Sequence, residues 1–309
     1  MIYGQVNGVT APVSKLVMGA PSAATVDEAR AVFDSYVEGG GNCFDTAFIY
    51  REGQSERVLG QWIADRGLRQ DVLILDKGAH TPNCDPVSVE RELSASLERL
   101  QTEYVDIYMM HRDNADVPVA EFVEVLNKEL RRGRVRALGA SNWSKDRFDA
   151  ANAYASEHRM TGFVALSNHF SLAELGEPTF EGCLDCMGPG WLEWLKARQV
   201  PNFSWSSQAG GLFVDGRAIP ERGSWSVAEN ERHRQRARQL GEKRGVPART
   251  IALAYVLAQP FLSFAIIGSR TVAHVVGAME AIDVNLSDAE IEWLKNEGQG
   301  ESEHGGRGA

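Results

Sequence analysis

The stretch GGGNCFDTAFIYREGQSERVLG, residues 39–60, joins a short apolar run to charged and polar residues. Its centre, residues 43–47, is typical of a buried strand that leads into a polar loop. Asp45 lies near the end of that strand, and Tyr50 follows five residues later. Because an ionised carboxylate beside an apolar strand costs free energy unless a charged or hydrogen-bonding group meets it, we expect Asp45 to have a partner.

Seven further apolar runs have strand length, and stretches with helical period separate them. The runs are dense in Val, Ile, Leu and Phe without strict alternation, as parallel strands covered on both faces require. All eight predicted strands are residues 15–19, 43–47, 72–77, 104–111, 135–141, 162–168, 202–207 and 264–269. Eight strand–helix units in about 250 residues predict an α/β fold, a (β/α)8 TIM barrel.

The two ends of the chain depart from this repeat. YGQVNGVTAPVS has an Asn–Gly pair between short apolar runs, which predicts a β-hairpin that caps the bottom of the barrel. Ser287, with Glu290 three residues later, predicts the start of an extra C-terminal helix. The polar, Gly-rich tail at about residues 298–309 is expected to be disordered. No linker divides the chain, so residues 1–309 are predicted to form a single domain.

Composition excludes several classes of function. The 309 residues include 42 Asp and Glu against 32 Lys and Arg, a formal charge of −10 that argues against binding to nucleic acid or an anionic membrane. No signal peptide and no apolar stretch of roughly 18 residues is found, so we expect a cytoplasmic protein. Cys183 and Cys186 have C-x-x-C spacing, as in a redox pair or half a zinc site. Without a second ligand pair we interpret the spacing as coincidence and predict no metal.

Polar residues follow the predicted strands at the end where TIM barrels carry their chemistry. Three consecutive strands end near Asp45, Lys77 and His111, and Tyr50 follows the first of them. These side chains are therefore expected to converge on one point.

The four residue types suit the reduction of a carbonyl group, in which an acid must protonate oxygen while hydride reaches carbon. Tyrosine, with a pKa of about 10, is too weak an acid by itself. A lysine cation about 4 Å away offers roughly 4 kcal/mol to the ionised tyrosine, so Lys77 is expected to make Tyr50 acidic. Asp45 is expected to keep Lys77 charged, and a neutral His111 to orient the carbonyl oxygen.

The motifs GGNCFDTAFIY, DKG, DIYMMHRD and LGASNW, in this order, resemble the aldo-keto reductase superfamily, including its potassium-channel β-subunit branch. The similarity extends from residue 15 to about 297. It implies an NAD(P)H-dependent oxidoreductase that converts an aldehyde or ketone into an alcohol. The residues at the positions of the family's catalytic tetrad are Asp45, Tyr50, Lys77 and His111.

The resemblance also implies a cofactor site. Its expected residues are Gly19, Ala20, Asp45, Ser141, Asn142, Asn168, Trp205, Ser206, Gly268, Ser269, Arg270 and His274. Asn168 stands where glutamine is commoner, and Trp205 where a tyrosine usually stacks on the nicotinamide. Gly277 and Ala278 replace a Glu–Asn pair that often grips the adenine. Because Arg270 and its neighbours suit a 2′-phosphate, NADP(H) is favoured, with NAD(H) as the alternative.

Two other functions remain open at this stage. Lys77 has the position of a Schiff-base lysine in barrel aldolases, but that chemistry leaves Tyr50 without a role. A regulatory subunit of the channel type would bind the cofactor and keep the tetrad without rapid turnover.

Tryptophans at or beyond the predicted strand ends, beside polar residues, suggest the substrate. The candidate substrate-binding residues are Arg112, Asp113, Trp143 and Trp225. An aromatic rim with several hydrogen-bonding groups suits a ring that carries hydroxyls, such as a keto-sugar or a cyclitol.

Overall fold

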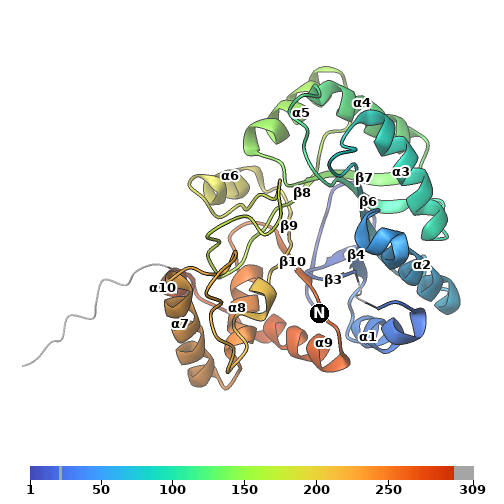
Figure 1. The fold of residues 1–309 in the computed structure, drawn as a ribbon. Helices are drawn as coiled ribbons and strands as arrows, with labels where there is room; N and C mark the ends of the chain where they lie inside the picture. The colour runs from blue at the N-terminus through green and yellow to red at the C-terminus, as the bar shows by residue number, and fades with distance from the viewer. Residues whose placement is uncertain (21–22, 296–309) are drawn as a thin grey trace, which may run out of the picture.

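The structure is a computed structural model, and it describes residues 1–20 and 23–295. Within these residues, eight parallel strands form a closed barrel in the order β10-β3-β4-β5-β6-β7-β8-β9 (Figure 1). The strands are β3 Leu16–Gly19, β4 Cys43–Asp45, β5 Leu73–Gly78, β6 Val105–Met110, β7 Val135–Ser141, β8 Ala165–Ser167, β9 Asn202–Ser204 and β10 Ser263–Ile267. Each overlaps a predicted strand, which confirms the (β/α)8 barrel.

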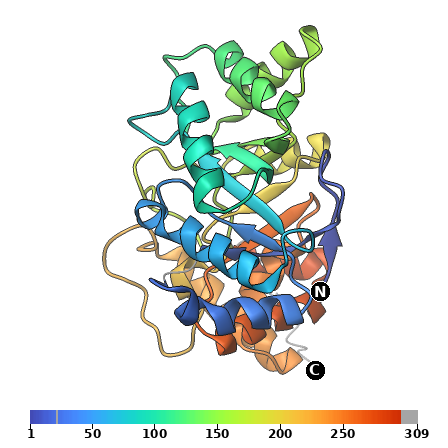
Figure 2. The ribbon, with the colours of Figure 1, turned by 90° about the vertical axis from the view of Figure 1, so that its right-hand side faces the viewer.

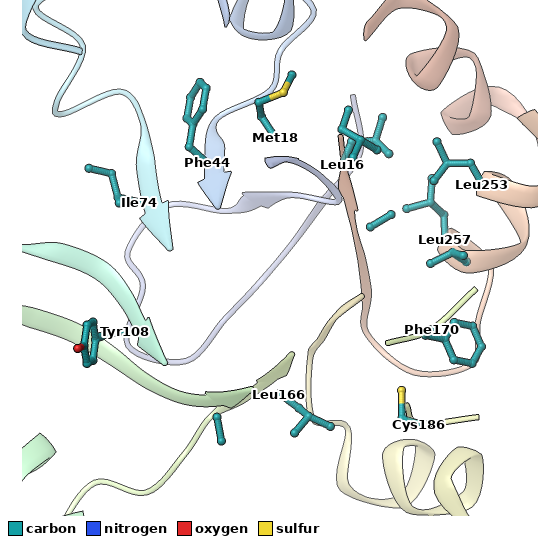
Figure 3. Close-up of a cluster of buried hydrophobic side chains, with 14 of the residues drawn as sticks. Leu16, Met18, Phe44, Ile74, Tyr108, Leu166, Phe170, Cys186, Leu253 and Leu257 are labelled. Atoms are coloured by element: carbon teal, nitrogen blue, oxygen red, sulfur yellow. The ribbon is translucent and has the colours of Figure 1, made fainter. Parts of the chain in front are cut away.

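Helices surround the barrel and bury its outer face (Figure 1). They are α1 Val26–Glu38, α2 Gln54–Arg66, α3 Pro86–Arg99, α4 Val119–Arg131, α5 Lys145–Glu157, α6 Trp191–Arg198, α7 Glu229–Arg244, α8 Ala248–Leu257, α9 Val272–Met279 and α10 Asp288–Lys295. Figure 3 shows part of the apolar layer, where Leu16, Phe44 and Ile74 of the strands belong to one cluster with Leu253 and Leu257 of α8. This layer holds each strand end in a fixed position.

The N-terminal hairpin closes one end of the barrel, as predicted. Strands β1 (Tyr3–Gly4) and β2 (Val13–Ser14) pair antiparallel, and Val6 and Val9 between them are buried against the barrel interior. A Cβ at Gly4 would lie 2.9 Å from the Phe264 ring, so only glycine fits there. Phe264 lies near the start of β10, which identifies this end as the bottom. Figure 2 shows the hairpin and the long loop before α7 at opposite ends of the molecule.

The extra C-terminal helix also forms as predicted. Ser287 Oγ accepts a hydrogen bond from the Glu290 backbone at 3.3 Å, and Glu290 Oε2 accepts one from the Ser287 backbone at 2.8 Å. This reciprocal pair satisfies amide groups at the start of α10. The tail predicted to be disordered lies outside the described residues. Among the described helices, none is long and apolar enough to cross a membrane.

Candidate active site

Asp45 and Lys77 form a buried ion pair at the ends of the neighbouring strands β4 and β5. Lys77 Nζ donates to Asp45 Oδ1 at 2.5 Å and to the Thr46 carbonyl at 2.8 Å. Both side chains are buried, at 5% and 3% exposure. The carboxylate at the end of an apolar strand therefore has the charged partner that its burial requires.

Tyr50 is brought to this pair by the loop after β4. Phe48 donates its amide to the Lys77 carbonyl at 2.8 Å, which extends the β4–β5 hydrogen bonding beyond the strand. Tyr50 begins the 3-10 turn η1, Tyr50–Gly53, and its ring centre lies 5.1 Å from Lys77 Nζ. The His111 ring packs edge-on at 5.5 Å from the Tyr50 ring. All four residues of the predicted tetrad thus lie together.

Burial and charge act in opposite directions on the protonation of this cluster. Burial by itself would lower the pKa of Lys77, but the Asp45 carboxylate and Tyr50 raise that pKa above its ordinary value, so the ammonium stays charged. Burial raises the pKa of Asp45, and the charge of Lys77 opposes this. The ion pair is therefore the form that satisfies both groups.

The pKa of Tyr50 differs from the expectation. Burial raises the pKa of Tyr50 above 10, and the Lys77 cation lowers it without fully compensating. Sequence reasoning counted the attraction of Lys77 and missed the larger effect of burial. The phenol is consequently protonated at neutral pH, while Lys77 still favours the ionised form.

His111, directly after β6, is neutral at pH 7. Burial and then the nearby Lys77 and Arg112 cations hold the pKa of His111 well below its usual range. Its Nδ1 has no hydrogen-bond partner within the described structure, and the His80 ring lies 4.9 Å away. A neutral ring with a free polar atom can hydrogen-bond to a ligand.

Three of the predicted cofactor residues gather at the ends of β7 and β8. Ser141 Oγ donates to the Ser167 carbonyl at 2.8 Å, and Asn142 Nδ2 donates to Ser141 Oγ at 3.0 Å. Asn168 is fully buried and its Nδ2 donates to the Trp143 carbonyl, but its Oδ1 has no partner among the described residues. A buried acceptor without a donor is costly, so Asn168 is suited to receive an amide N–H from a ligand.

Other predicted cofactor residues follow β9 and β10. Trp205 and Ser206 come directly after β9, and Ser206 adopts a left-handed conformation with φ of 51°. Gly268 lies directly after β10, is exposed, and has no atoms within 4 Å of the position of a Cβ. This open backbone lies beside Ser269, which is buried. Close approach of a ligand to the chain is therefore possible here.

Arg270 and His274 frame the start of α9. Thr271 caps that helix by accepting from the His274 backbone at 3.2 Å, and the Arg270 amide points at His274 Nδ1 at 3.4 Å. Both side chains are exposed. A helix N-terminus beside a guanidinium suits a phosphate group.

Gly19 and Ala20 lie at the same end of the barrel, where β3 ends. A Cβ at Gly19 would lie 3.1 Å from the Ile267 carbonyl, which accounts for glycine at this strand end. Ala20 is half-buried. The expected cofactor residues therefore extend from β3 and β10 to β7 and β8 across one face of the barrel.

Two candidate substrate residues are placed differently from the expectation. Trp143 is fully buried, packs edge-on against Phe163 at 5.1 Å, and donates its Nε1 to the Arg112 carbonyl. The Asp113 carboxylate accepts three hydrogen bonds from Arg147, at 2.7, 2.8 and 3.2 Å. Trp143 is thus part of the core packing and Asp113 is part of an ion pair, and a contact of either residue with substrate stays a prediction.

Arg112 and Trp225, the other two candidates, remain next to the site. Arg112 is buried directly after His111. Trp225 is half-buried, and its ring lies 5.4 Å from that of His169, which also packs against Trp205 at 4.9 Å. His169 was not assigned a role from sequence, and its signal is only its place directly after Asn168.

The segment 183–186 covers the ends of β7 and β8, which the sequence did not reveal. Leu184 donates its amide to Asn142 Oδ1 at 3.0 Å, and Cys186 donates its amide to the His169 carbonyl at 2.9 Å. The thiols of Cys183 and Cys186 are free and buried. No group of metal-binding residues occurs within the described ranges. The two cysteines therefore belong to a loop packed on the site.

Surface hollows open at both ends of the barrel. One of about 220 Å³ lies between Trp205 and the loop that contains Cys183, at the end of the barrel that carries the tetrad. Another of about 640 Å³ is lined by Gln5, Pro201 and Leu262 at the bottom. The larger volume lies at the opposite end from the tetrad, and the smaller hollow is lined by Trp205, one of the predicted cofactor residues.

Comparisons with known proteins agree with this geometry. The model of the aldo/keto reductase family matches residues 15–296. An uncharacterized oxidoreductase of Bacillus subtilis, YrpG, is 30% identical over 92% of both chains, and norsolorinic acid reductase B of Aspergillus parasiticus is 31% identical over 87% of this chain and 74% of its own. An aldo-keto reductase of Klebsiella pneumoniae, solved in complex with NADPH, has 26% identity and a TM-score of 0.75, with 97% of each chain covered.

Proposed function

The chain belongs to the aldo/keto reductase family, and we propose that it reduces the carbonyl group of an aldehyde or ketone to an alcohol with NADPH. The observation that carries this proposal is the Lys77–Asp45 ion pair at 2.5 Å beside Tyr50 and His111. A lysine cation, a protonated phenol and a neutral imidazole meet at one point, as acid catalysis on a carbonyl oxygen requires.

Each of the four residues has a separate part in proton transfer. Tyr50 donates its proton to the carbonyl oxygen, and the phenol is protonated before the reaction because the ordinary tyrosine pKa of about 10, which burial raises further, lies above neutral pH. Lys77 stabilises the tyrosinate that remains, while Asp45 holds Lys77 charged. Neutral His111 orients the carbonyl oxygen by hydrogen bonding.

The residues at the strand ends fit a nicotinamide cofactor. Asn168 Oδ1, buried and without a partner in the described chain, suits an amide N–H of the carboxamide. Arg270 and Ser269 at the start of α9 suit the 2′-phosphate, which favours NADPH over NADH. When bound, NADPH supplies the hydride for the carbonyl carbon. The complex of the Klebsiella pneumoniae relative with NADPH supports the same assignment.

The substrate proposed is a cyclic carbonyl compound that carries hydroxyl groups. Trp205 and Trp225 flank His169 and supply an aromatic wall. Arg112 and His111 supply polar groups beside Tyr50. An apolar face next to hydrogen-bonding groups suits such a ring better than an apolar aldehyde.

Oxidation of NADPH by the purified protein tests the proposal with two substrates of similar size, a cyclic keto-sugar and an apolar aldehyde. Both should be reduced, and the keto-sugar with the higher kcat/KM. A preference for the apolar aldehyde would contradict the substrate class. Tight NADPH binding without turnover of any carbonyl would favour a regulatory subunit over a reductase.

A further inference from the structure

Arg112 is a buried cation without an acidic partner. Its exposure is 6%, yet it makes no ion pair with any carboxylate in residues 1–20 and 23–295. The neighbouring Asp113 is paired with Arg147 instead. A buried charge without a counter-charge is costly, so this position requires an explanation beyond packing.

The contacts of the guanidinium compensate only part of its charge. Nη1 donates to the His111 carbonyl at 2.9 Å, and Nη2 donates to Cys183 Sγ at 3.2 Å. Nε has no partner among the atoms described. Because a thiol sulfur is a weak acceptor, an oxygen anion could replace it at Nη2 at small cost.

Arg112 lies beside the proton-donating residues and away from the expected phosphate positions. It directly follows His111, after β6, which pairs with β5. In the barrel order, β6 is diametrically opposite β10, after which Arg270 is placed. An anion at Arg112 therefore belongs to the substrate side of the site and not to the phosphates of the cofactor.

A surface hollow lies next to the residue that Arg112 contacts. Cys183, its hydrogen-bond partner, lines the hollow of about 220 Å³ together with Trp205. Gly182 lies over the guanidinium, where a Cβ would be 3.4 Å from Arg112 Nε. Asp185 lines the same hollow but accepts from the Met187 amide and makes no ion pair with Arg112 within the described residues. Cys183 thus contacts the Arg112 cation and also lines the hollow.

We propose that Arg112 binds a carboxylate on the substrate, so that the preferred substrates are carbonyl compounds that also carry a carboxylate. This inference rests on the proposed reductase function and narrows it from hydroxylated rings to acidic ones. A carboxylate oxygen takes the place of Cys183 Sγ at Nη2.

The experiment compares 4-carboxybenzaldehyde with its methyl ester, which keeps the ring and the aldehyde but removes the charge. The wild-type protein should reduce the acid with a kcat/KM about tenfold or more above that of the ester, as expected for a charge-assisted hydrogen bond in a buried site. Equal kcat/KM values for the two compounds would overturn the inference and leave the reductase proposal intact.

Variants then assign the preference to Arg112. Arg112→Met should bring the acid-to-ester ratio close to one, and Arg112→Lys should retain a preference for the acid because it keeps the charge. Lys145→Met is the matched control, since Lys145 is a half-buried cation that contacts Pro189 and the Trp191 ring; its ratio should stay at the wild-type value. If Arg112→Met has a lower melting temperature but an unchanged acid-to-ester ratio, Arg112 stabilises the loop and does not bind the carboxylate.

Calorimetric titration with benzoate and benzamide separates the two proposals. The wild-type protein should bind benzoate more tightly than benzamide, and Arg112→Met should lose that difference. If neither aldehyde is reduced but this difference holds, the anion site stands and the reductase proposal fails. If the wild-type protein and Arg112→Met bind benzoate with equal affinity, Arg112 is not an anion site, whether or not the aldehydes are reduced.

Discussion

Replacement of Lys77 by methionine tests whether the lysine cation helps Tyr50 to release its proton. Lys77 Nζ lies 5.1 Å from the centre of the Tyr50 ring. At an effective dielectric constant of about 20, opposite charges at this separation attract by about 3 kcal/mol. The transition state for proton transfer gains part or all of this attraction, because negative charge develops on Tyr50. Loss of the lysine cation should therefore lower kcat by roughly tenfold to two-hundredfold.

The same substitution leaves Asp45 buried without its partner. Breaking a buried ion pair on one side costs about 3–5 kcal/mol of stability, which would confuse the kinetic result. The Asp45→Asn, Lys77→Met double variant removes both charges and should unfold in urea closer to wild type than Lys77→Met alone. Kinetic losses are therefore measured in the double variant as well as in the single one.

Tyr50→Phe removes the proposed proton donor itself, and together with Lys77→Met it forms a double-mutant cycle. Its kcat should fall by about 10²–10⁴-fold, and adding Lys77→Met should cost little more, since both changes abolish one function. Tyr108→Phe is the matched control: its buried hydroxyl has no partner in the described structure and belongs to the layer under the helices (Figure 3). Single-turnover oxidation of bound NADPH at neutral pH is the assay. Losses that multiply would show that Lys77 and Tyr50 act independently, and the mechanism would be refuted.

Three further predictions concern the cofactor, the core and pH. In fluorescence titrations, Arg270→Ala should weaken the binding of NADPH by about 1.5–3 kcal/mol and the binding of NADH much less. Equal losses for the two cofactors would show that Arg270 does not bind the 2′-phosphate. Trp143→Ala should lower the free energy of unfolding in urea by about 3–5 kcal/mol, because the fully buried ring leaves a cavity; a negligible loss would contradict its core position. Burial lowers the pKa of His169 and of His233 from 6.5 to about 4, so below pH 6.5 the unfolded chain binds protons that the native chain does not. Stability should fall as the pH drops from about 6.5 to 4, with a smaller slope in His233→Gln.

The sequence predicts the barrel and its tetrad because both depend on local patterns. An apolar run followed by a polar residue marks a strand and its end, and eight such runs leave the barrel as the arrangement that buries them. Once the strands are parallel neighbours, Asp45, Lys77 and His111 must meet at one edge. Successive side chains of a strand point to opposite faces, so Lys77 and its neighbour Asp76 lie on different sides of β5. Asp76 faces the helices, is fully buried and does not belong to the tetrad.

The loop contacts could not be predicted in this way, because they join residues far apart in the chain. The Asp113–Arg147 pair joins residues 34 positions apart, and the Arg112–Cys183 contact joins residues 71 apart. Neither has a local signature, so Asp113 and Arg112 were equivalent polar candidates in the sequence. The balance of burial and charge at Tyr50 likewise depends on how the loop packs, which spacing does not reveal.

This division between strand ends and loops has a consequence for how the site selects substrates. Lys77 and Asp45, which are proposed to support Tyr50, lie at or near strand ends that the hydrophobic layer fixes, so their separation is set by the barrel. Arg112 instead contacts Cys183, on a loop that is joined to the barrel by hydrogen bonds to Asn142 and His169 and not by the hydrophobic layer under the helices. If Arg112 binds substrate as proposed, substitutions in that loop should change which carbonyl compounds are reduced and leave the acid chemistry intact. The proposed acid catalysis and substrate choice are therefore expected to be separable, because different elements of the fold hold the residues assigned to each.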